Sequence, residues 1–398
     1  MARRTFRALL GAAALVAAGL GLGASPAGAE EVKIGLFTPL TGSGAVVGLD
    51  MQRGVQLALD RVNQGYDVPL QDGGVRRLGP GLLGGPINLI IEDSESRPAA
   101  AMDAVRKLVN VDKVTVVLGE YSTGRTLPTG QFTNSSGMVH VSIGANSPTL
   151  REIGPFFFNA IGLASLQGLK MLELAQSEIG ARTIATLLPN NPWGVGVEIA
   201  TCEAAPKFGM ECVSTVRYEE QKTDYRPELR QLTAPDPDAV IFFAYGSDAA
   251  LILRQAYELG LDAAETWIGT EVSNWASDVA DISEVAEGVR GLEHDVGGEF
   301  YEAQYGAAYR ERFGEPPLTA FGAFGYDAAM LAALAIEQAG SADSDTIRKA
   351  MHEVSRVYRG LTGNLSFDAD GMRLNQEYGV FIYQDGALRP YTPKPKAE

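Results

Sequence analysis

The chain has 398 residues, which suggests about two domains, and 45% of them are apolar, which is ample for hydrophobic cores. Acidic residues outnumber basic ones, 49 to 33, so the formal net charge is −16. A chain this acidic repels nucleic acid phosphates and anionic lipids, so neither is expected as a partner.

The first segment has the pattern of a secretory signal peptide. Residues 1–7 carry only positive charges, the apolar run Ala8–Ala24 follows, and Ala27 and Ala29 form an A-x-A cleavage site. An uncleaved membrane anchor is the alternative, but the run is short and rich in glycine for a spanning helix. We therefore predict a signal peptide over residues 1–29 and a mature protein in the periplasm.

Short apolar strands alternate with helices through the first half of the mature chain. The pattern predicts strands at residues 32–37, 87–92, 114–118 and 138–142, and helices at 49–63, at 98–110 and from Arg125 onward. Residues 72–86, rich in glycine and proline, are expected to form an exposed hairpin loop. Strands made of Val, Ile and Leu runs indicate a parallel sheet covered on both faces.

The same alternation begins again after Phe158. Strands are predicted at residues 183–188, 211–218, 239–245 and 265–269, and helices at 165–179, 195–208 and 249–260. Helices at 300–313 and 320–340 and strands at 361–367 and 378–383 close the chain. The sequence therefore predicts an α/β protein with two doubly wound lobes.

Two cysteines, Cys202 and Cys212, lie at the end of a predicted helix and at the start of the next strand. An exported location permits a disulfide between them. A metal or redox pair is the alternative, but no histidine or third cysteine is near. We expect a structural disulfide, no metal site and no cofactor. His140, in a predicted buried strand, is expected to be a hydrogen-bonded core residue.

The loops after the strands are the expected place for a ligand, because open parallel sheets bind ligands at the carboxyl ends of their strands. In the loop Gly119–Arg125, Ser122 and Thr123 offer hydroxyls at a helix N-terminus, which attracts carboxylates and phosphates. An ordinary helix cap is the alternative. The small residues of Ile143–Pro148 either let a ligand approach the backbone or form a simple turn.

The second lobe supplies Glu271, directly after a predicted buried strand, and Trp193, in a loop. Glu271 can pair an ammonium group, although a solvated loop acid is the commoner case. Trp193 can cover the apolar part of a ligand, or it can be a core or surface residue.

The sequence does not match the enzyme motifs that it approaches. The spacing in Gly42–Gly48 is one residue too long for G-x-G-x-x-G, and Gly119–Gly124 does not match G-x-S-x-G. No enzyme activity is therefore expected.

Taken together, several of these stretches resemble the periplasmic leucine/isoleucine/valine-binding protein family of ABC transporter receptors. The resemblance covers nearly the whole mature chain and rests on Val32–Gly42, Gly119–Pro128, Ser142–Pro148, Arg254–Gly260, Trp267–Glu271 and Glu377–Phe381. It implies the type I periplasmic binding protein fold, with two Rossmann-like lobes joined by a three-strand hinge near residues 160, 295 and 375. The lobes would comprise residues 30–160 with 296–374, and residues 161–295 with 375–398.

The resemblance also implies a ligand site between the lobes. Thr123, with Ser122 beside it, matches the hydroxyl that grips the α-carboxylate of the ligand, and Glu271 matches the acid that pairs the ammonium. Backbone contacts are implied for Gly144, Ala145 and Asn146, and aromatic cover for Trp193 and Tyr245. The chain departs from the family pattern in two places. Val47 stands near a position that is often aromatic in the family, which leaves the identity of the ligand's side chain undetermined. The family's first-lobe disulfide is also absent.

The implied function is that of a solute receptor for an ABC importer. A monomer would close over an amino acid, of the branched-chain type or similar, or over a short amide, and deliver it to the permease in the inner membrane. Two other classes stay open. One is a sensor or co-receptor of the same fold that presents its closed form to a signalling partner, and the other is a doubly wound enzyme.

Overall fold

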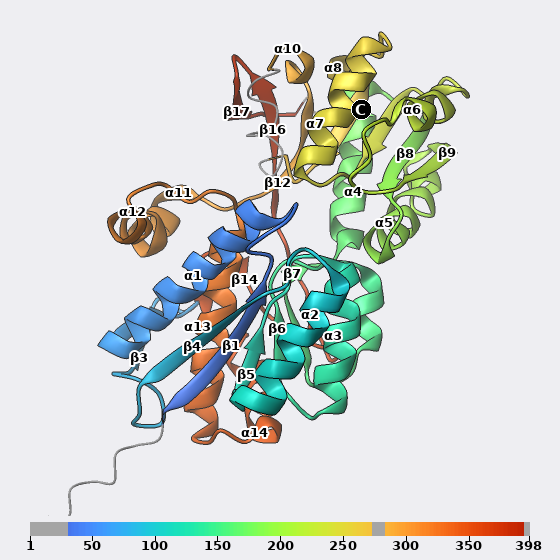
Figure 1. Ribbon diagram of the computed structural model, residues 1–398. Coiled ribbons are helices and arrows are strands. Elements are labelled where there is room, and N and C mark those ends of the chain that lie inside the picture. Colours follow the sequence, from blue (N-terminus) through green and yellow to red (C-terminus); the bar gives the residue numbers. More distant parts are fainter. Residues whose placement is uncertain (1–30, 273–282, 394–398) are drawn as a thin grey trace, which may run out of the picture.

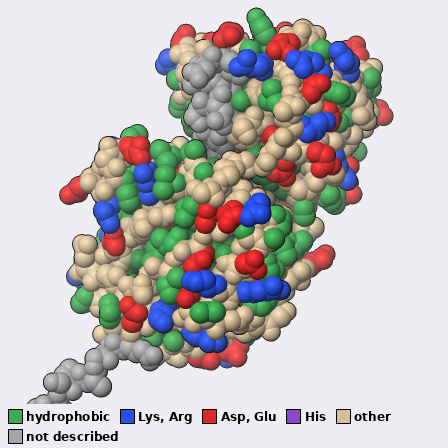
Figure 2. Space-filling model, in the orientation of Figure 1, with side chains coloured by type: hydrophobic (Ala, Val, Ile, Leu, Met, Phe, Trp, Pro, Cys, Tyr) green, Lys and Arg blue, Asp and Glu red, His purple; other side chains and the backbone are tan. Residues whose placement is uncertain are grey.

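The computed structural model describes residues 31–272 and 283–393, which form two α/β lobes (Figure 1). Each lobe is built on one sheet with helices on both faces, the arrangement that suits strands made of continuous apolar runs. A space-filling view shows a narrow waist between the lobes and interspersed acidic and basic side chains (Figure 2). None of the described helices is long and apolar enough to cross a membrane.

Lobe 1 is built on a six-stranded parallel sheet with the order β15-β7-β6-β5-β1-β4. Its strands are β1 (Val32–Thr38), β4 (Ile87–Asp93), β5 (Val116–Leu118), β6 (His140–Ser142), β7 (Phe157–Gly162) and β15 (Met372–Arg373). Its helices are α1 (Ala45–Gln64), α2 (Pro98–Lys107), α3 (Thr123–Ser135), α13 (Phe321–Ala339) and α14 (Ser344–Val354). Helices α1 and α13 can cross closely because Gly54 has no side chain. A Cβ at this position would lie 1.8 Å from the Gly322 carbonyl oxygen.

Lobe 2 is built on a seven-stranded sheet with the order β17-β16-β12-β11-β10-β8-β9, in which β16 and β17 are antiparallel and the rest parallel. Its strands are β8 (Thr183–Pro189), β9 (Glu211–Tyr218), β10 (Ala239–Phe242), β11 (Trp267–Thr270), β12 (Arg290–His294), β16 (Tyr378–Gln384) and β17 (Ala387–Pro390). Its helices are α4 (Ala164–Leu174), α5 (Pro192–Cys202), α6 (Arg226–Thr233), α7 (Gly246–Glu258), α8 (Ala263–Thr266) and α10 (Ser283–Ala286).

The chain passes between the two sheets three times: after β7, after β12 and after β15. The second passage leads into α11 (Gly298–Tyr301) and α12 (Ala307–Phe313), which lie to one side of the waist (Figure 1). These passages are consistent with the predicted hinge. The lobe boundaries at residues 160, 295 and 375 remain a prediction.

Two segments differ from the sequence prediction. A hairpin does form at the expected place, because β3 (Val75–Leu78) pairs with β2 (Tyr66–Pro69), but it is not wholly exposed: Leu78 and Leu82 are buried in the lobe 1 core. The expected strand at 361–367 is reduced to the two residues of β14 (Gly363–Asn364), which pair with β13 (Arg359–Gly360). The strand does not extend because the N–H groups of Leu361 and Thr362 donate to the buried Asp327 carboxylate, at 2.9 Å each, instead of to a neighbouring strand.

Several elements were not predicted from the sequence, among them β7, β12, α6 and α14. In β12, the polar residues Arg290, Glu293 and His294 interrupt the apolar pattern expected of a strand, although the strand is almost entirely buried. Helices α6 and α14 are rich in charged side chains and bury only one face each. In addition, α3, α5 and α7 begin earlier than predicted, which places Thr123 and Trp193 in first helical turns instead of loops.

Candidate functional site

A buried cavity lies between the lobes, at the carboxyl ends of the parallel strands. It contains about 190 Å³ of empty space, part of it open solvent, and is lined by Tyr121, Ser122, Thr123, Gly144 and Asn146 of lobe 1 and Trp193, Tyr245 and Glu271 of lobe 2. All but one of the residues predicted to bind a ligand therefore meet in one place. Ala145 is the exception, and Tyr121 is a residue that the sequence analysis missed.

The lobes touch on either side of this cavity. The Ser147 hydroxyl donates a hydrogen bond to the Pro192 carbonyl at 3.1 Å, and the Gln221 amide donates one to the Ser43 hydroxyl at 3.3 Å. Each bond joins lobe 1 to lobe 2. The two walls of the cavity are therefore in contact with each other in this structure.

A buried ion pair shapes the loop between β5 and α3. Glu120 is fully buried and accepts a hydrogen bond from Arg125 Nε at 2.6 Å. It also accepts bonds from the Ser94 hydroxyl at 2.6 Å and from the Ser122 N–H at 2.7 Å. A charge is tolerated in the interior only when it is paired and hydrogen-bonded, so this network holds the loop in one conformation. The loop in turn presents Ser122 and Thr123 to the cavity.

Helix α3 points its N-terminus at the lobe 1 end of the cavity. Ser122 is the N-cap, but its side chain makes no capping bond, so the ordinary capping role that the sequence left open is not the one observed. The Thr123 hydroxyl accepts a long bond from the Ser147 N–H, at 3.4 Å. The first N–H groups of a helix have no acceptor within it and carry the positive end of its dipole. This end of the cavity therefore suits a carboxylate.

The loop after β6 lines the same end but not in the predicted way. The Gly144 N–H donates to the Glu120 carbonyl at 3.0 Å, and the Asn146 carbonyl accepts a bond from the Ala164 N–H at 2.7 Å. Both backbone groups are thus engaged inside the protein. Asn146 instead offers its side-chain Nδ2, which is buried and has no hydrogen-bond partner in the described part of the chain. Ala145 packs into an apolar cluster beneath the loop and does not line the cavity.

Glu271 lies at the opposite end of the cavity, directly after β11. Its side chain is only 4% exposed, so it is not the solvated loop acid that the sequence left as an alternative. Its backbone has a φ of 50°, a conformation that is costly without glycine and that gathers at functional sites. Burial and repulsion from Glu293 raise the pKa of Glu271 to about 8, against an opposing hydrogen bond with Gln167. A cationic partner would favour the charged form of this carboxyl.

Three aromatic rings wall the space between these two ends. The Trp193 ring lies 4.9 Å from that of Tyr245, measured between centroids, and Tyr245 faces Tyr121 across the cleft at 6.0 Å. Trp193 also packs against Phe243 in the lobe 2 core, so it is a core residue that also lines the cavity. Its Nε1, like Nδ2 of Asn146, is a buried donor with no partner among residues 31–272 and 283–393. An unmade bond of this kind costs about 1–3 kcal/mol, which a ligand oxygen would recover.

One feature of the sequence could have pointed to Tyr121 as a site residue: it directly precedes Ser122 in the predicted binding loop. The space beside it is made by Gly144, where a Cβ would lie 2.9 Å from the Tyr121 ring. Sequence spacing does not show which way such a ring turns. The structure turns it into the cavity, where its ring also packs edge-on against Phe321 at 5.1 Å between centroids.

The two structural predictions made for cysteine and histidine are confirmed. Cys202 at the end of α5 and Cys212 in β9 form a disulfide. His140 is buried and bonds to the Gly119 carbonyl at 2.6 Å and to the Thr133 hydroxyl at 3.1 Å. Burial lowers the pKa of His140 to about 4, so the ring is neutral. No cluster of His, Cys, Asp and Glu in the described segments has the makings of a metal site.

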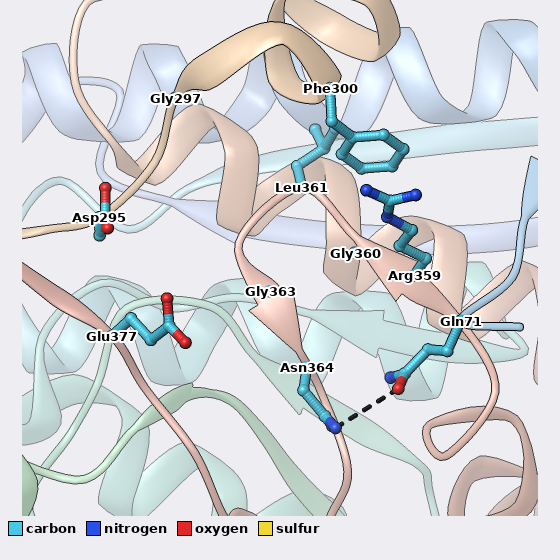
Figure 3. Close-up of a pocket in the computed structure, with 10 residues that line it drawn as sticks. All are labelled: Gln71, Asp295, Gly297, Phe300, Arg359, Gly360, Leu361, Gly363, Asn364 and Glu377. Atoms are coloured by element: carbon cyan, nitrogen blue, oxygen red, sulfur yellow. Dashed lines mark hydrogen bonds between the residues drawn. The ribbon is translucent and has the colours of Figure 1, made fainter. Parts of the chain in front are cut away.

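A larger cavity lies beside the passages between the lobes (Figure 3). It contains about 840 Å³ of empty space, part of it open solvent. Figure 3 shows Asp295 and Glu377 on one side of it and Arg359, Gln71 and Asn364 on the other. All five residues are exposed, and no predicted site residue lies here. We therefore place the candidate site in the smaller, buried cavity.

Comparison with known proteins agrees with this geometry. Residues 31–387 match the family described as periplasmic binding protein. The chain belongs to the periplasmic binding protein family. One curated relative, the leucine-, isoleucine-, valine-, threonine- and alanine-binding protein of Pseudomonas aeruginosa, is 26% identical over 368 residues, 91% of this chain and 92% of that protein. The Leu/Ile/Val-binding protein homolog 1 of Brucella abortus is 26% identical over 362 residues, with the same coverage of 91% and 92%.

Solved structures show the same fold as this periplasmic binding protein. A leucine-binding protein, LivK, from Thermotoga maritima superposes with a TM-score of 0.80 at 22% identity, over 91% of this chain and 98% of that one. LivJ from Streptococcus pneumoniae, in complex with isoleucine, has a TM-score of 0.76 at 22% identity, over 92% and 99% of the two chains. The predicted type I periplasmic binding protein fold, with two Rossmann-like lobes, is thereby confirmed, as is the resemblance to the Leu/Ile/Val-binding proteins.

Proposed function

We propose that this protein is the solute receptor of an ABC importer and that it binds a small amino acid between its lobes. The observation that carries the proposal is the pairing of opposite electrical partners in one buried cavity. The N-terminus of α3, with Ser122 and Thr123, suits the carboxylate of an amino acid, and Glu271 suits its ammonium group. The names of the relatives, which specify binding of leucine, isoleucine and valine, support this choice.

The two charged ends of the ligand would bind to different lobes. Only the closed arrangement brings both ends of the cavity within reach, so the ligand shifts the population toward closure. Closure also excludes water, which strengthens both contacts in a medium of lower dielectric constant. We propose that the inner-membrane permease recognises this closed form. The family is periplasmic by description, and we place the mature protein there; the predicted signal peptide lies outside the described residues.

The test of the proposed function is to identify the ligand directly. The exported protein is purified and then denatured, and the small molecule that it releases is analysed by mass spectrometry. Calorimetry then measures the dissociation constants of amino acids and short amides. We expect an amino acid to copurify and to bind saturably at one site per chain. Turnover of a substrate, or no binding of any amino acid or amide, would contradict the proposal.

Thr123→Val is expected to weaken amino-acid binding by about 1.5 kcal/mol, or roughly tenfold, because one hydrogen bond to the carboxylate is lost. The loss stays moderate because the N–H groups of the α3 N-terminus remain. Valine also leaves the buried Ser147 N–H without its acceptor, so the free energy of unfolding should fall by about 1–3 kcal/mol as well. Thr129→Val is the matched control, since this hydroxyl bonds to the Arg125 carbonyl within α3 at 2.8 Å and does not line the cavity. Calorimetry with both variants checks the result.

The affinity for an amino acid is expected to fall about tenfold for each pH unit below about 8. Burial and the neighbouring Glu293 raise the pKa of Glu271 to about 8, so below that pH the empty site holds a proton that the ammonium must displace. Tyr121 and Tyr378 are the other titratable groups near Glu271, and burial raises the pKa of both well out of this range.

Calorimetry from pH 6 to pH 9, in buffers of different ionisation enthalpy, measures the proton released on binding. An amino acid should release nearly one proton below pH 7. A neutral amide would accept a hydrogen bond from the protonated carboxyl and would release no proton. Constant affinity across this range for an amino acid would contradict the role given to Glu271.

A further inference from the structure

The interlobe cleft contains an inner and an outer compartment and, beside them, a third space lined by Arg125 and Glu220 as well as by Tyr121 and Tyr245. The inner one is the cavity of about 190 Å³ that holds Thr123 and Glu271. The outer one contains about 730 Å³ of empty space, part of it open to solvent, and lies between the start of α1 and the start of α7. Tyr121 and Tyr245 line both compartments, so this pair of rings is the partition between them.

Packing holds both rings in place. Tyr121 is 6% exposed, and its ring packs edge-on against Phe321 of α13 at 5.1 Å between centroids. The Tyr245 ring lies 4.9 Å from that of Trp193, and Asn191 Nδ2 donates a bond to its hydroxyl at 3.3 Å. A ring with neighbours on several sides cannot turn aside without leaving a void. The partition is therefore a rigid wall rather than a loose side chain.

The outer compartment has the lining of a pocket for an apolar side chain. Its lobe 1 wall consists of small or apolar residues at the start of α1, namely Gly42, Ser43, Gly44, Ala45, Val46 and Val47. Val46 is 55% exposed, which is unusual for a valine and leaves apolar surface facing the compartment. No described aromatic ring other than the two partition residues lines it. It would accept a long or aromatic side chain if the wall were open.

We propose that Tyr121 and Tyr245 set an upper limit on the size of the bound amino acid's side chain, and that the outer compartment is a latent pocket for larger ones. This inference rests on the proposed function. The rings of Tyr121, Tyr245 and Trp193 line the inner cavity together, and the first two also close it off from the outer compartment. A side chain as bulky as that of phenylalanine therefore requires Tyr121 to move, whereas a small one does not have to pass the partition.

The test compares the dissociation constants of alanine, valine, leucine and phenylalanine for the wild-type protein and for Tyr121→Ala. A hydrophobic pocket discriminates by roughly 10–200-fold per methylene group, so the wild type should bind phenylalanine at least tenfold more weakly than valine. In Tyr121→Ala the two compartments join, and we expect phenylalanine to gain at least tenfold while alanine gains nothing. Tyr257→Ala is the control, because Tyr257 is 59% exposed on α7 and lines neither compartment.

Two results would overturn the inference: phenylalanine binding the wild type as tightly as valine, or an unchanged ratio of the two dissociation constants in a folded Tyr121→Ala. If that variant does not fold, Tyr121→Leu keeps an apolar side chain in place and should shift the same ratio by a smaller amount. The comparison of phenylalanine with valine can be made on the wild-type protein alone, so it does not depend on the folding of a variant. If the wild type binds none of the four amino acids, it is the proposed function that fails, which is a distinguishable outcome.

Discussion

Replacing Glu271 with alanine is expected to weaken amino-acid binding by about 2–5 kcal/mol, or roughly 30-fold to several-thousand-fold in the dissociation constant. The ammonium of the ligand would lose its charged partner at a position where the carboxylate is almost fully buried. Calorimetry of the purified variant measures the loss. The variant should fold as the wild type does, because removing this buried carboxyl also removes its repulsion with Glu293.

Two further variants make the Glu271 prediction specific. Glu271→Gln keeps the size of the side chain and removes the charge, so most of the loss should persist if charge is what matters. Glu265→Ala is the matched control, since Glu265 is exposed in α8, directly before the strand that Glu271 follows. Unchanged amino-acid affinity in Glu271→Ala, with normal circular dichroism, would remove the zwitterion model.

Replacing Glu120 with alanine is expected to lower the free energy of unfolding of lobe 1 by about 3–5 kcal/mol. The substitution leaves the Arg125 guanidinium buried without its carboxylate, and it removes acceptors from the Ser94 hydroxyl and the Ser122 N–H. Urea unfolding monitored by circular dichroism measures the loss. Ligand affinity should fall as well, because the loop that carries Ser122 and Thr123 is no longer held.

Glu302→Ala provides the comparison for an exposed ion pair. Glu302 pairs with Arg310, both side chains are about half exposed, and breaking such a pair costs about 0–1 kcal/mol. A second comparison replaces both partners, as Glu120→Leu with Arg125→Met, which should recover much of the stability because no charge is left buried. If Glu120→Ala proved no more costly than Glu302→Ala, the buried pair would not be what holds the loop.

Much of the site could be inferred from sequence because loops that follow parallel strands converge at one sheet edge. That rule places Ser122 and Asn146 near one another without any coordinates, whereas the position of Glu271 opposite them, on the other lobe, was implied by the resemblance to the Leu/Ile/Val-binding proteins. The disulfide between Cys202 and Cys212 followed from an exported location and from the absence of other ligands nearby. In each case the argument needed only the order of strands and the chemistry of the side chains.

Other features of the site depend on contacts between distant segments. Glu293 raises the pKa of Glu271 from β12, a strand whose polar residues conceal it in the sequence. Ser94 and Glu120 share a hydrogen bond although they belong to different strand-to-helix units. Ala145 satisfies the pattern of a ligand contact and yet turns into the core, because adjacent residues of a loop can face opposite ways.

The sequence by itself determined the class of fold, the lobe architecture and the chemical types gathered at the cleft, because these follow from local patterns of apolar residues and from side-chain chemistry. Only the tertiary structure decided the size of the cavity, the raised pKa of Glu271 and the position of Tyr121 between two compartments. These properties arise from burial and from packing between residues far apart in the chain, and both depend on distances that no local pattern records.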